Sequence, residues 1–332
     1  MTRSILCLAL LVAAPVLAAQ QAQPQPQPPV LPYQLPAKME QHRFFIEAQA
    51  PSGKILRLFT DTGGGMNLTT SGADKLGVAY QLPANPAREP AGTTRWPYYV
   101  GPWIPSPKSA RPDMQIPILA PPPGVTFDGM LGTAWFGDRH WEFDYRAGTL
   151  RLLPDGVLPK SDAAHVVTLG FKTDDRGQHT THFPRIPARI DGEDLQFLFD
   201  TGASFRLDEA AAAALGDASV RERAGNFITA SVRERAGNFI TASVMQGWRQ
   251  RHPEWLYLET GDIGMPMIRV PDIELAGHHT GPAWFSVRPD KAFHEYMAQW
   301  MDKPVDGALG GEAIRSFRIS VDYPSATAVF EQ

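Results

Sequence analysis

Short apolar runs separated by turn residues dominate the hydrophobic pattern of this chain. Alternating or continuous apolar positions predict strands at 42–50, 55–60, 141–145, 149–153, 185–190 and 195–199. Turn signals such as Pro51-Ser52-Gly53 and Asp191-Gly192 join these strands in pairs. Helical patterns are short at 73–76, 134–136 and 208–215, and an amphipathic helix is predicted at 290–301. The pattern therefore predicts an all-β protein with a few short helices.

Two of the predicted strands end in the same polar motif. The strand at 55–60 leads into Asp61-Thr62-Gly63-Gly64, and the strand at 195–199 leads into Asp200-Thr201-Gly202-Ala203. The spacing around the two motifs also agrees. The interval is sixteen residues in four cases: Asp61–Gly77, Asp200–Gly216, Asp128–Asp144 and Asp306–Asp322. We interpret the agreement as an internal duplication, with an N-terminal β-rich lobe over 39–158 and a C-terminal lobe over 159–332.

Paired carboxylates suit one kind of chemistry. If the two lobes face each other, Asp61 and Asp200 come within hydrogen-bonding range, and two such carboxyls share one proton because both cannot ionise cheaply. The ionised member can take a proton from a water, while the protonated member donates to a carbonyl oxygen. Gly63 and Gly202 would let the backbone turn close to the acids. This arrangement is suited to adding water to an amide.

The motifs resemble those of the pepsin-like and retropepsin-like aspartic peptidases. The matching segments are 59–64 (FTDTGG) and 199–204 (FDTGAS), each with a downstream element, Met130-Leu131-Gly132 or Ala308-Leu309-Gly310. The resemblance covers most of 39–332. It implies two similar β-barrel-like lobes with the active-site cleft between them. It also implies that no homodimer is needed, so we expect a monomer.

The resemblance assigns roles to individual residues. Asp61 and Asp200 would be the catalytic pair, Thr62 and Thr201 would interlock beneath them with Gly63 and Gly202 in the same loops, and Gly132 and Gly310 would close ψ-shaped loops. A tyrosine of a covering hairpin is expected in 90–105, where Tyr98 or Tyr99 would contact substrate; ordinary packing is the alternative for both. The hydroxyl that usually follows Asp-Thr-Gly is missing at Gly64 and Ala203, so we expect activity at milder pH than in a gastric-type enzyme.

The N-terminus reads as an export signal over 1–19, with Arg3, an apolar run and a small-residue cleavage site, although a membrane anchor is the alternative. Residues 20–38 are rich in Pro and Gln and predict a linker or, alternatively, a propeptide. The only cysteine, Cys7, lies in the signal, so the mature chain can form no disulfide or thiolate metal site. We expect a periplasmic or secreted protein.

Composition and the remaining motifs restrict the function further. The net charge of −4 gives no sign of a nucleic-acid partner. No cofactor is indicated, and the histidine pairs lack a third ligand in register, so we predict no metal. Asp144 and Asp322 precede Tyr and are expected to shape turns. Residues 219–230 and 231–242 are identical, which indicates a recent local duplication or, alternatively, a sequence-assembly error, and we expect a surface loop there.

The sequence therefore predicts an aspartic endopeptidase that acts on extended peptides or proteins. The alternative is a noncatalytic peptide- or envelope-binding protein on the same scaffold.

Overall fold

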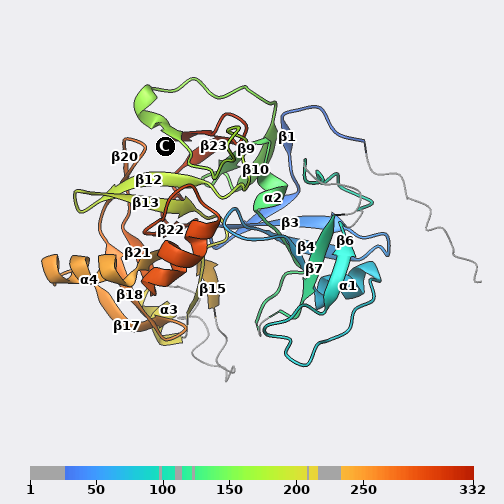
Figure 1. Cartoon of the computed structure of the whole chain (residues 1–332), viewed down its shortest axis with the longest axis horizontal. Coiled ribbons are helices and arrows are strands. Elements are labelled where there is room, and N and C mark those ends of the chain that lie inside the picture. Colours follow the sequence, from blue (N-terminus) through green and yellow to red (C-terminus); the bar gives the residue numbers. More distant parts are fainter. Residues whose placement is uncertain (1–26, 97–98, 109–113, 122–123, 208, 216–232) are drawn as a thin grey trace, which may run out of the picture.

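The computed structural model describes residues 27–332 except 97–98, 109–113, 122–123, 208 and 216–232. Most of the described secondary structure is β-strand, as predicted, and it forms three sheets (Figure 1). The order of strands leaves each of these sheets open, so no closed barrel is present in the part of the chain described. The expectation of barrel-like form is corrected in that respect.

The N-terminal sheet lies on the right of Figure 1 and carries the first Asp-Thr-Gly loop. Its seven strands are, in spatial order, β2 (Ala37–Glu40), β3 (Arg43–Gln49), β4 (Ile55–Thr60), β8 (Gly129–Leu131), β5 (Asn67–Thr69), β7 (Gln115–Leu119) and β6 (Gly92–Arg95). The helix α1 (Thr70–Leu76) follows β5; Thr69 caps it through its side chain, and Gly77 ends it at a φ of 70°.

The C-terminal sheet lies on the left of Figure 1 and carries the second Asp-Thr-Gly loop. Its eleven strands are β15 (Arg233–Ala236), β14 (Ser204–Leu207), β17 (Tyr257–Asp262), β18 (Met265–Val270), β21 (Ala283–Arg288), β16 (Asn238–Thr241), β22 (Gly307–Leu309), β13 (Glu193–Phe199), β12 (Arg185–Ile190), β19 (Ile273–Leu275) and β20 (His278–Thr280). The helices described beside this sheet include α3 (Glu209–Ala214), α4 (Ala242–Arg251), and the short π and 3₁₀ turns η3 (Ala292–Tyr296) and η4 (Met297–Gln299).

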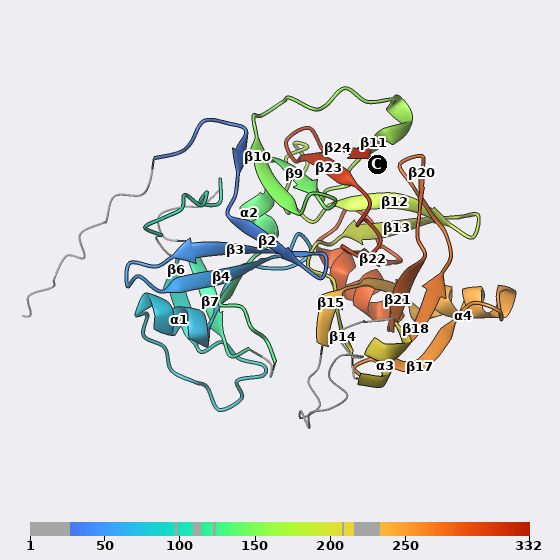
Figure 2. The same ribbon diagram turned by 180° about the vertical axis from the view of Figure 1, so that it is seen from behind.

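A third sheet takes strands from both halves of the chain, and we call it the shared sheet. Its order is β1 (Tyr33–Gln34), β10 (Thr149–Leu153), β9 (His140–Asp144), β23 (Arg318–Asp322), β24 (Thr327–Glu331) and β11 (Val166–Thr168). The helix α2 (Thr133–Phe136) precedes β9, and the 3₁₀ turn η1 (Ala163–His165) precedes β11. Both views place this sheet above the other two (Figure 2).

The centre of the shared sheet shows a local two-fold relation between the halves. Strands β9 and β23 pair antiparallel, with Glu142 opposite Ser320. Ser320 lies 178 residues after Glu142, the same interval that separates Asp128 from Asp306. A residue and its counterpart in the other half can face each other only on a two-fold axis, so the axis passes through this pair. This register is the one that a duplication with an interval of 178 residues would give.

The ordered fold begins earlier than the predicted linker allows. Tyr33 pairs with Leu152 in the shared sheet, and the Tyr33 hydroxyl donates to the carbonyl of Trp103. Leu35 is buried, and β2 starts at Ala37. Apolar residues between the prolines suffice to fasten this stretch, so residues 33–38 belong to the folded part. The predicted signal at 1–19 lies outside the described residues, within which no helix has both the length and the apolar character to cross a bilayer.

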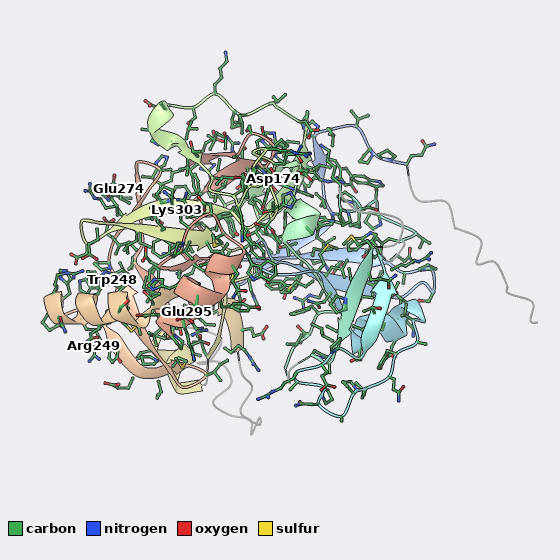
Figure 3. The ribbon with its side chains drawn as sticks, viewed as in Figure 1. Asp174, Trp248, Arg249, Glu274, Glu295 and Lys303 are labelled. Carbon is green, nitrogen blue, oxygen red and sulfur yellow. The ribbon has the colours of Figure 1, made fainter. Side chains whose placement is uncertain are left out.

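One of the matched intervals does not mark equivalent helices. Helix α1 follows β5, which pairs antiparallel with β8. In the other half the strand with that pairing is β16, which is followed by α4, and not β14, which leads to α3. The counterpart of α1 is therefore α4, which buries Trp248 in the core and lays Arg249 over the ring of Tyr257 (Figure 3). The interval from Asp200 to Gly216 matches by coincidence.

The second copy of the twelve-residue repeat forms part of the sheet, contrary to the surface loop predicted. Its residues make up β15 and β16. The side-chain oxygen of Asn238 accepts from the backbone of Gly310, and its amide donates to Trp284 and Glu312. Asn238 is fully buried. The first copy, at 219–230, lies outside the described residues.

Deletion of one twelve-residue copy is expected to leave the fold intact. Leu207 pairs with Arg233, and α3, about 9 Å long, lies between them in sequence. After deletion six residues would join Ala214 to Arg233, enough to span about 20 Å. The shorter connection should stabilise the protein by up to about 1 kcal/mol, measured by urea unfolding.

A pair of matched variants shows which copy supports the sheet. Asn238→Ala should destabilise the full chain by about 2–4 kcal/mol, because it leaves buried partners unpaired. Asn226→Ala, at the same place in the first copy, should cost less than about 0.5 kcal/mol. Equal losses in the two variants would contradict the assignment.

Candidate active site

Each of the two aspartates follows a central strand of its own sheet. Strand β4 runs parallel to β8, and the Asp61 amide donates to the carbonyl of Leu131 at 3.0 Å. Strand β13 likewise runs parallel to β22, and the Asp200 amide donates to Leu309 at 2.9 Å. The downstream Leu-Gly elements predicted from the sequence therefore hold the start of each loop.

The carboxylates of Asp128 and Asp306 complete the same pattern. Asp128 accepts from the amide of Arg57 at 2.8 Å and donates its own amide back to Arg57. Asp306 makes the same two bonds with Gln196, with the carboxylate bond again at 2.8 Å. Both carboxylates therefore fasten the strand that leads to an Asp-Thr-Gly loop, a role that the repeated Asp-Gly in the sequence does not by itself reveal.

Two threonines join the loops reciprocally. The amide of Thr62 donates to the hydroxyl of Thr201 at 3.1 Å, and the amide of Thr201 donates to the hydroxyl of Thr62 at 3.0 Å. The Thr62 hydroxyl donates in turn to Phe199 at 2.6 Å, and that of Thr201 to Thr60 at 3.4 Å. Both threonines are fully buried. The interlock that the resemblance implies is present and ties the two sheets together beneath the aspartates.

The two carboxyls face each other above this interlock. A Cβ added to Gly63 would overlap the carboxyl of Asp200, and one added to Gly202 would overlap that of Asp61. The amides of these glycines donate to the aspartate two residues earlier, each at 2.9 Å. Each carboxyl is thus oriented by its own loop and lies against the glycine of the other loop.

Burial raises the pKa of both aspartates of the pair. Desolvation is the largest cause for both residues, and for Asp61 the charge of Asp200 adds to it, so the pKa of Asp61 lies well above its ordinary value. The pKa of Asp200 is also raised, although hydrogen bonds from Asp61 and the loop amides oppose the increase. A single proton on the pair would remove the repulsion between two like charges held this close together.

The residues after the two motifs are small for steric reasons. A Cβ at Gly64 would overlap a carboxylate oxygen of Asp61, so only glycine fits there with the acid in this position. Ala203 is buried, and its methyl lies close to the backbone of Gly310. Backbone amides of Gly64 and Ala203 lower the pKa of the adjacent acids, where no side-chain hydroxyl is available to do so.

Removal of the interlock hydroxyls is expected to destabilise the protein. Thr62→Val leaves the amide of Thr201 and the carbonyl of Phe199 without a buried partner, at a cost of about 2–4 kcal/mol. Thr60→Val is the matched control, because its buried hydroxyl makes a single bond within one sheet, to Phe44. The control should lose about 1 kcal/mol in urea unfolding. Equal losses would mean that the interlock adds nothing to the junction.

The structure does not bring Tyr99 to the aspartates. Tyr99 is buried in the core against Trp96, and its neighbour Val100 bonds to Gln49 at the far end of β3. Gln49 pairs with Ile55, six residues before Asp61, or about 20 Å along the strand. Packing, the alternative for this aromatic cluster, is what the structure shows for Tyr99. Tyr98 lies outside the described residues.

Tyr145 lies near the site but was not singled out by the sequence. Its hydroxyl is buried with no hydrogen-bond partner among the described residues. Burial raises its pKa, and the charge of Asp200 adds to the increase. Asp144 just before it shapes a turn by accepting from the amides of Arg146 and Ala147, and Asp322 accepts from Ser325 in the equivalent turn. The turn role predicted for these two aspartates agrees with these bonds.

No model of a known protein family matches this sequence, and no curated protein is significantly similar to it. Within the described residues no three His, Cys, Asp or Glu side chains are grouped as metal ligands would be.

Proposed function

We propose that this protein is an aspartic endopeptidase whose catalytic residues are Asp61 and Asp200. The observation that carries the proposal is the facing carboxyl pair, held by two like loops and locked from below by Thr62 and Thr201. Isolated strand-end aspartates in water would not share a proton or have raised pKa values.

The pair would act as a coupled acid and base. The ionised carboxyl accepts a proton from a water molecule, which attacks the peptide carbonyl carbon, and the protonated carboxyl donates to the carbonyl oxygen. The carboxyl that accepted the proton from water then donates it to the amide nitrogen, the C–N bond breaks, and a hydroxyl of the tetrahedral intermediate returns its proton to the other carboxylate. Both aspartates are partly exposed, so a substrate can reach them. Thr62, Thr201, Gly63 and Gly202 position the acids.

The finer features follow from the same proposal. The two like halves would act as two lobes with the substrate cleft between them, and a single chain would supply the whole site as a monomer. An extended peptide would bind partly through backbone hydrogen bonds. The protein would act outside the cytoplasm, in the periplasm or after secretion, without a cofactor or metal.

A peptide-library digest tests the proposal. The full chain is incubated with mixed peptides between pH 3 and pH 8, and cleaved bonds are identified by mass spectrometry. We expect internal cleavage that is blocked by a peptide in which a secondary alcohol replaces the amide of a cleaved bond, because the alcohol mimics the tetrahedral intermediate. If peptides bind but none is cleaved at any pH, the protein is instead a noncatalytic peptide binder.

The pH profile follows from the direction of the pKa shifts. Hydrolysis needs one proton on the pair, and the raised pKa values of both aspartates keep that proton bound at higher pH than a free Asp would. Below the lower pKa both carboxyls are protonated, and no base remains. We therefore expect optimal kcat/KM above about pH 4. An optimum below about pH 3, measured with a cleaved library peptide, would contradict this assignment of charge.

A further inference from the structure

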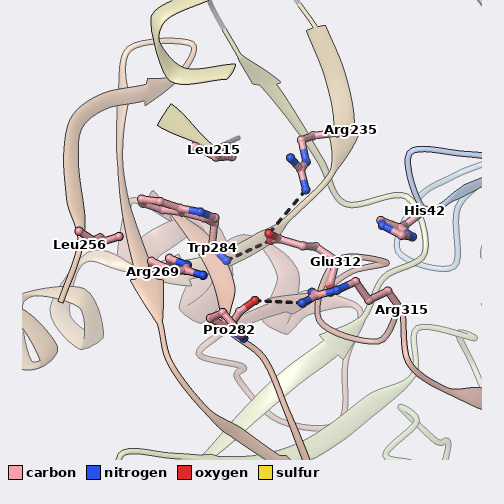
Figure 4. Close-up of a pocket in the computed structure, with 9 residues that line it drawn as sticks. All are labelled: His42, Leu215, Arg235, Leu256, Arg269, Pro282, Trp284, Glu312 and Arg315. Atoms are coloured by element: carbon pink, nitrogen blue, oxygen red, sulfur yellow. Dashed lines mark hydrogen bonds and ion pairs between the residues drawn. The ribbon is translucent and has the colours of Figure 1, made fainter. Parts of the chain in front are cut away.

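A cationic cavity of about 390 Å³ lies beside the strand that leaves the second Asp-Thr-Gly loop. Figure 4 shows the guanidinium groups of Arg235, Arg269 and Arg315 around it, with His42 at one side. Arg235 belongs to β15, whose neighbour Ala236 pairs with Ser204 of β14. The volume suits a small organic molecule. The cavity is separate from the aspartate pair and has no role in the hydrolysis described above.

The positive charge of the cavity is incompletely balanced. Glu312 is its only acidic lining residue, and one of its oxygens already accepts from the Trp284 amide and from Asn238. The other oxygen lies 3.8 Å from Arg235, which is long for an ion pair. Burial raises the pKa of Glu312 to about 7, so near neutral pH it carries only part of a charge. Three guanidinium groups thus face at most one carboxylate.

Two further groups in the cavity have no partner for their polar atoms. The side chain of Arg269 makes no hydrogen bond or ion pair with any described residue. It affects Glu312 through its charge alone. The Nδ1 atom of His42 is buried and without a hydrogen-bond partner in the described part of the chain. Burial and the charges of Arg315 and Arg235 lower the pKa of His42, so it remains a neutral donor or acceptor.

Part of the lining is apolar. The indole of Trp284 and the side chain of Leu256 lie beside Arg269, which pairs with Trp284 across neighbouring strands (Figure 4). Arg235 and Arg315 lie nearer His42. Trp284 is mostly buried, whereas Leu256 is exposed at the rim. A ligand that fits such a site carries a planar anion at one end and an apolar body at the other, because the arginine fork binds a carboxylate in two places.

We propose that this cavity binds the carboxylate of a small apolar or aromatic acid, or the C-terminal carboxylate of a peptide with an apolar last residue. The carboxylate lies between Arg235 and Arg269, and the apolar body packs on Trp284. The proposal is independent of catalysis and is tested on protein in which Asp200 is replaced by Asn, so that no peptide is consumed.

Calorimetric titration with matched probes tests the site. Phenylacetate should bind with a Kd near about 1 mM or below, and neutral phenylacetamide at least about tenfold more weakly, because only the acid meets the arginines. A tripeptide that ends in Phe, tested with a free and with an amidated C-terminus, distinguishes the two possible ligands, a small acid and a peptide C-terminus. Tighter binding of the free-acid peptide than of phenylacetate identifies a peptide terminus as the ligand, and the reverse identifies a small acid.

Two variants with opposite expected effects on phenylacetate binding make the test specific. Arg269→Gln should weaken phenylacetate binding at least about tenfold, whereas Glu312→Gln should tighten it severalfold by removing the competing carboxylate. Arg176→Gln, at an exposed turn, is the control and should change nothing. Equal binding of acid and amide, or unchanged binding in Arg269→Gln, would overturn the proposal. Since Glu312 is buried, its variant is first checked by thermal unfolding, and Arg235→Gln replaces it if it does not fold.

Discussion

Replacement of Asp61 or Asp200 by Asn is expected to reduce kcat/KM for a cleaved library peptide by at least about 10³-fold while the protein stays folded. An amide can neither accept the proton of the attacking water nor share a proton with the partner acid. The Asn oxygen can still accept from the amide of Gly63 or Gly202, so the loop geometry survives. Each variant should be at least as stable as the parent, because it removes the repulsion between two acids.

The matched control for this loss is Asp144→Asn. Asp144 also follows a strand and is also repeated in the other half, but its carboxylate only accepts from the amides of Arg146 and Ala147. An Asn oxygen can accept the same bonds, so activity should remain within about twofold of the parent. Cleavage by Asp200→Asn at the rate of Asp144→Asn would rule out the carboxyl pair as the catalyst.

Features set by local sequence were predicted well. Strands β4, β10 and β12 begin and end where the apolar pattern indicates, because alternation and flanking turns suffice to define a half-buried strand. The Asp-Thr-Gly loops and their Leu-Gly partners are likewise short-range motifs placed on strands. We predicted that the carboxyls of Asp61 and Asp200 lie together because we treated the two halves as copies. The pairing of Glu142 with Ser320 supports that treatment.

Features set by long-range pairing were not predictable in the same way. Helix α3 has a convincing alanine run at the expected interval, but whether it matches α1 depends on which strand pairs with β22. Tyr99 is aromatic and lies in the predicted range of 90–105. Its burial, however, depends on the hydrogen bond of Val100 to β3, which the local sequence does not indicate. The repeat at 219–242 predicted a surface loop because a duplicated segment suggests that the fold tolerates insertion there. Asn238 in the second copy is instead buried and hydrogen-bonded to the backbone of Gly310. Each error concerns a partner that is distant in sequence.

A methyl group at Gly202 is expected to disable the site without unfolding the protein. The Cβ of an alanine there would overlap the carboxyl carbon and both oxygens of Asp61, so the acid must move from its place opposite Asp200. A displacement of about 1 Å between reacting groups typically costs about 10²-fold in rate. Overpacking should also lower the free energy of unfolding by about 1–3 kcal/mol. Gly63→Ala should behave alike, because its Cβ would overlap the carboxyl of Asp200.

Gly65→Ala separates this steric effect from any general sensitivity of the loop. Gly65 lies two residues after Gly63, is exposed, and has open space where a Cβ would stand. Its variant should therefore retain kcat/KM within about twofold, measured beside Gly63→Ala and Gly202→Ala with the same peptide and followed by urea unfolding. If Gly202→Ala were as active as Gly65→Ala, the two carboxyls would not need the close approach on which the shared proton depends. Gly63 and Gly202 would then be needed only for the turn of the backbone.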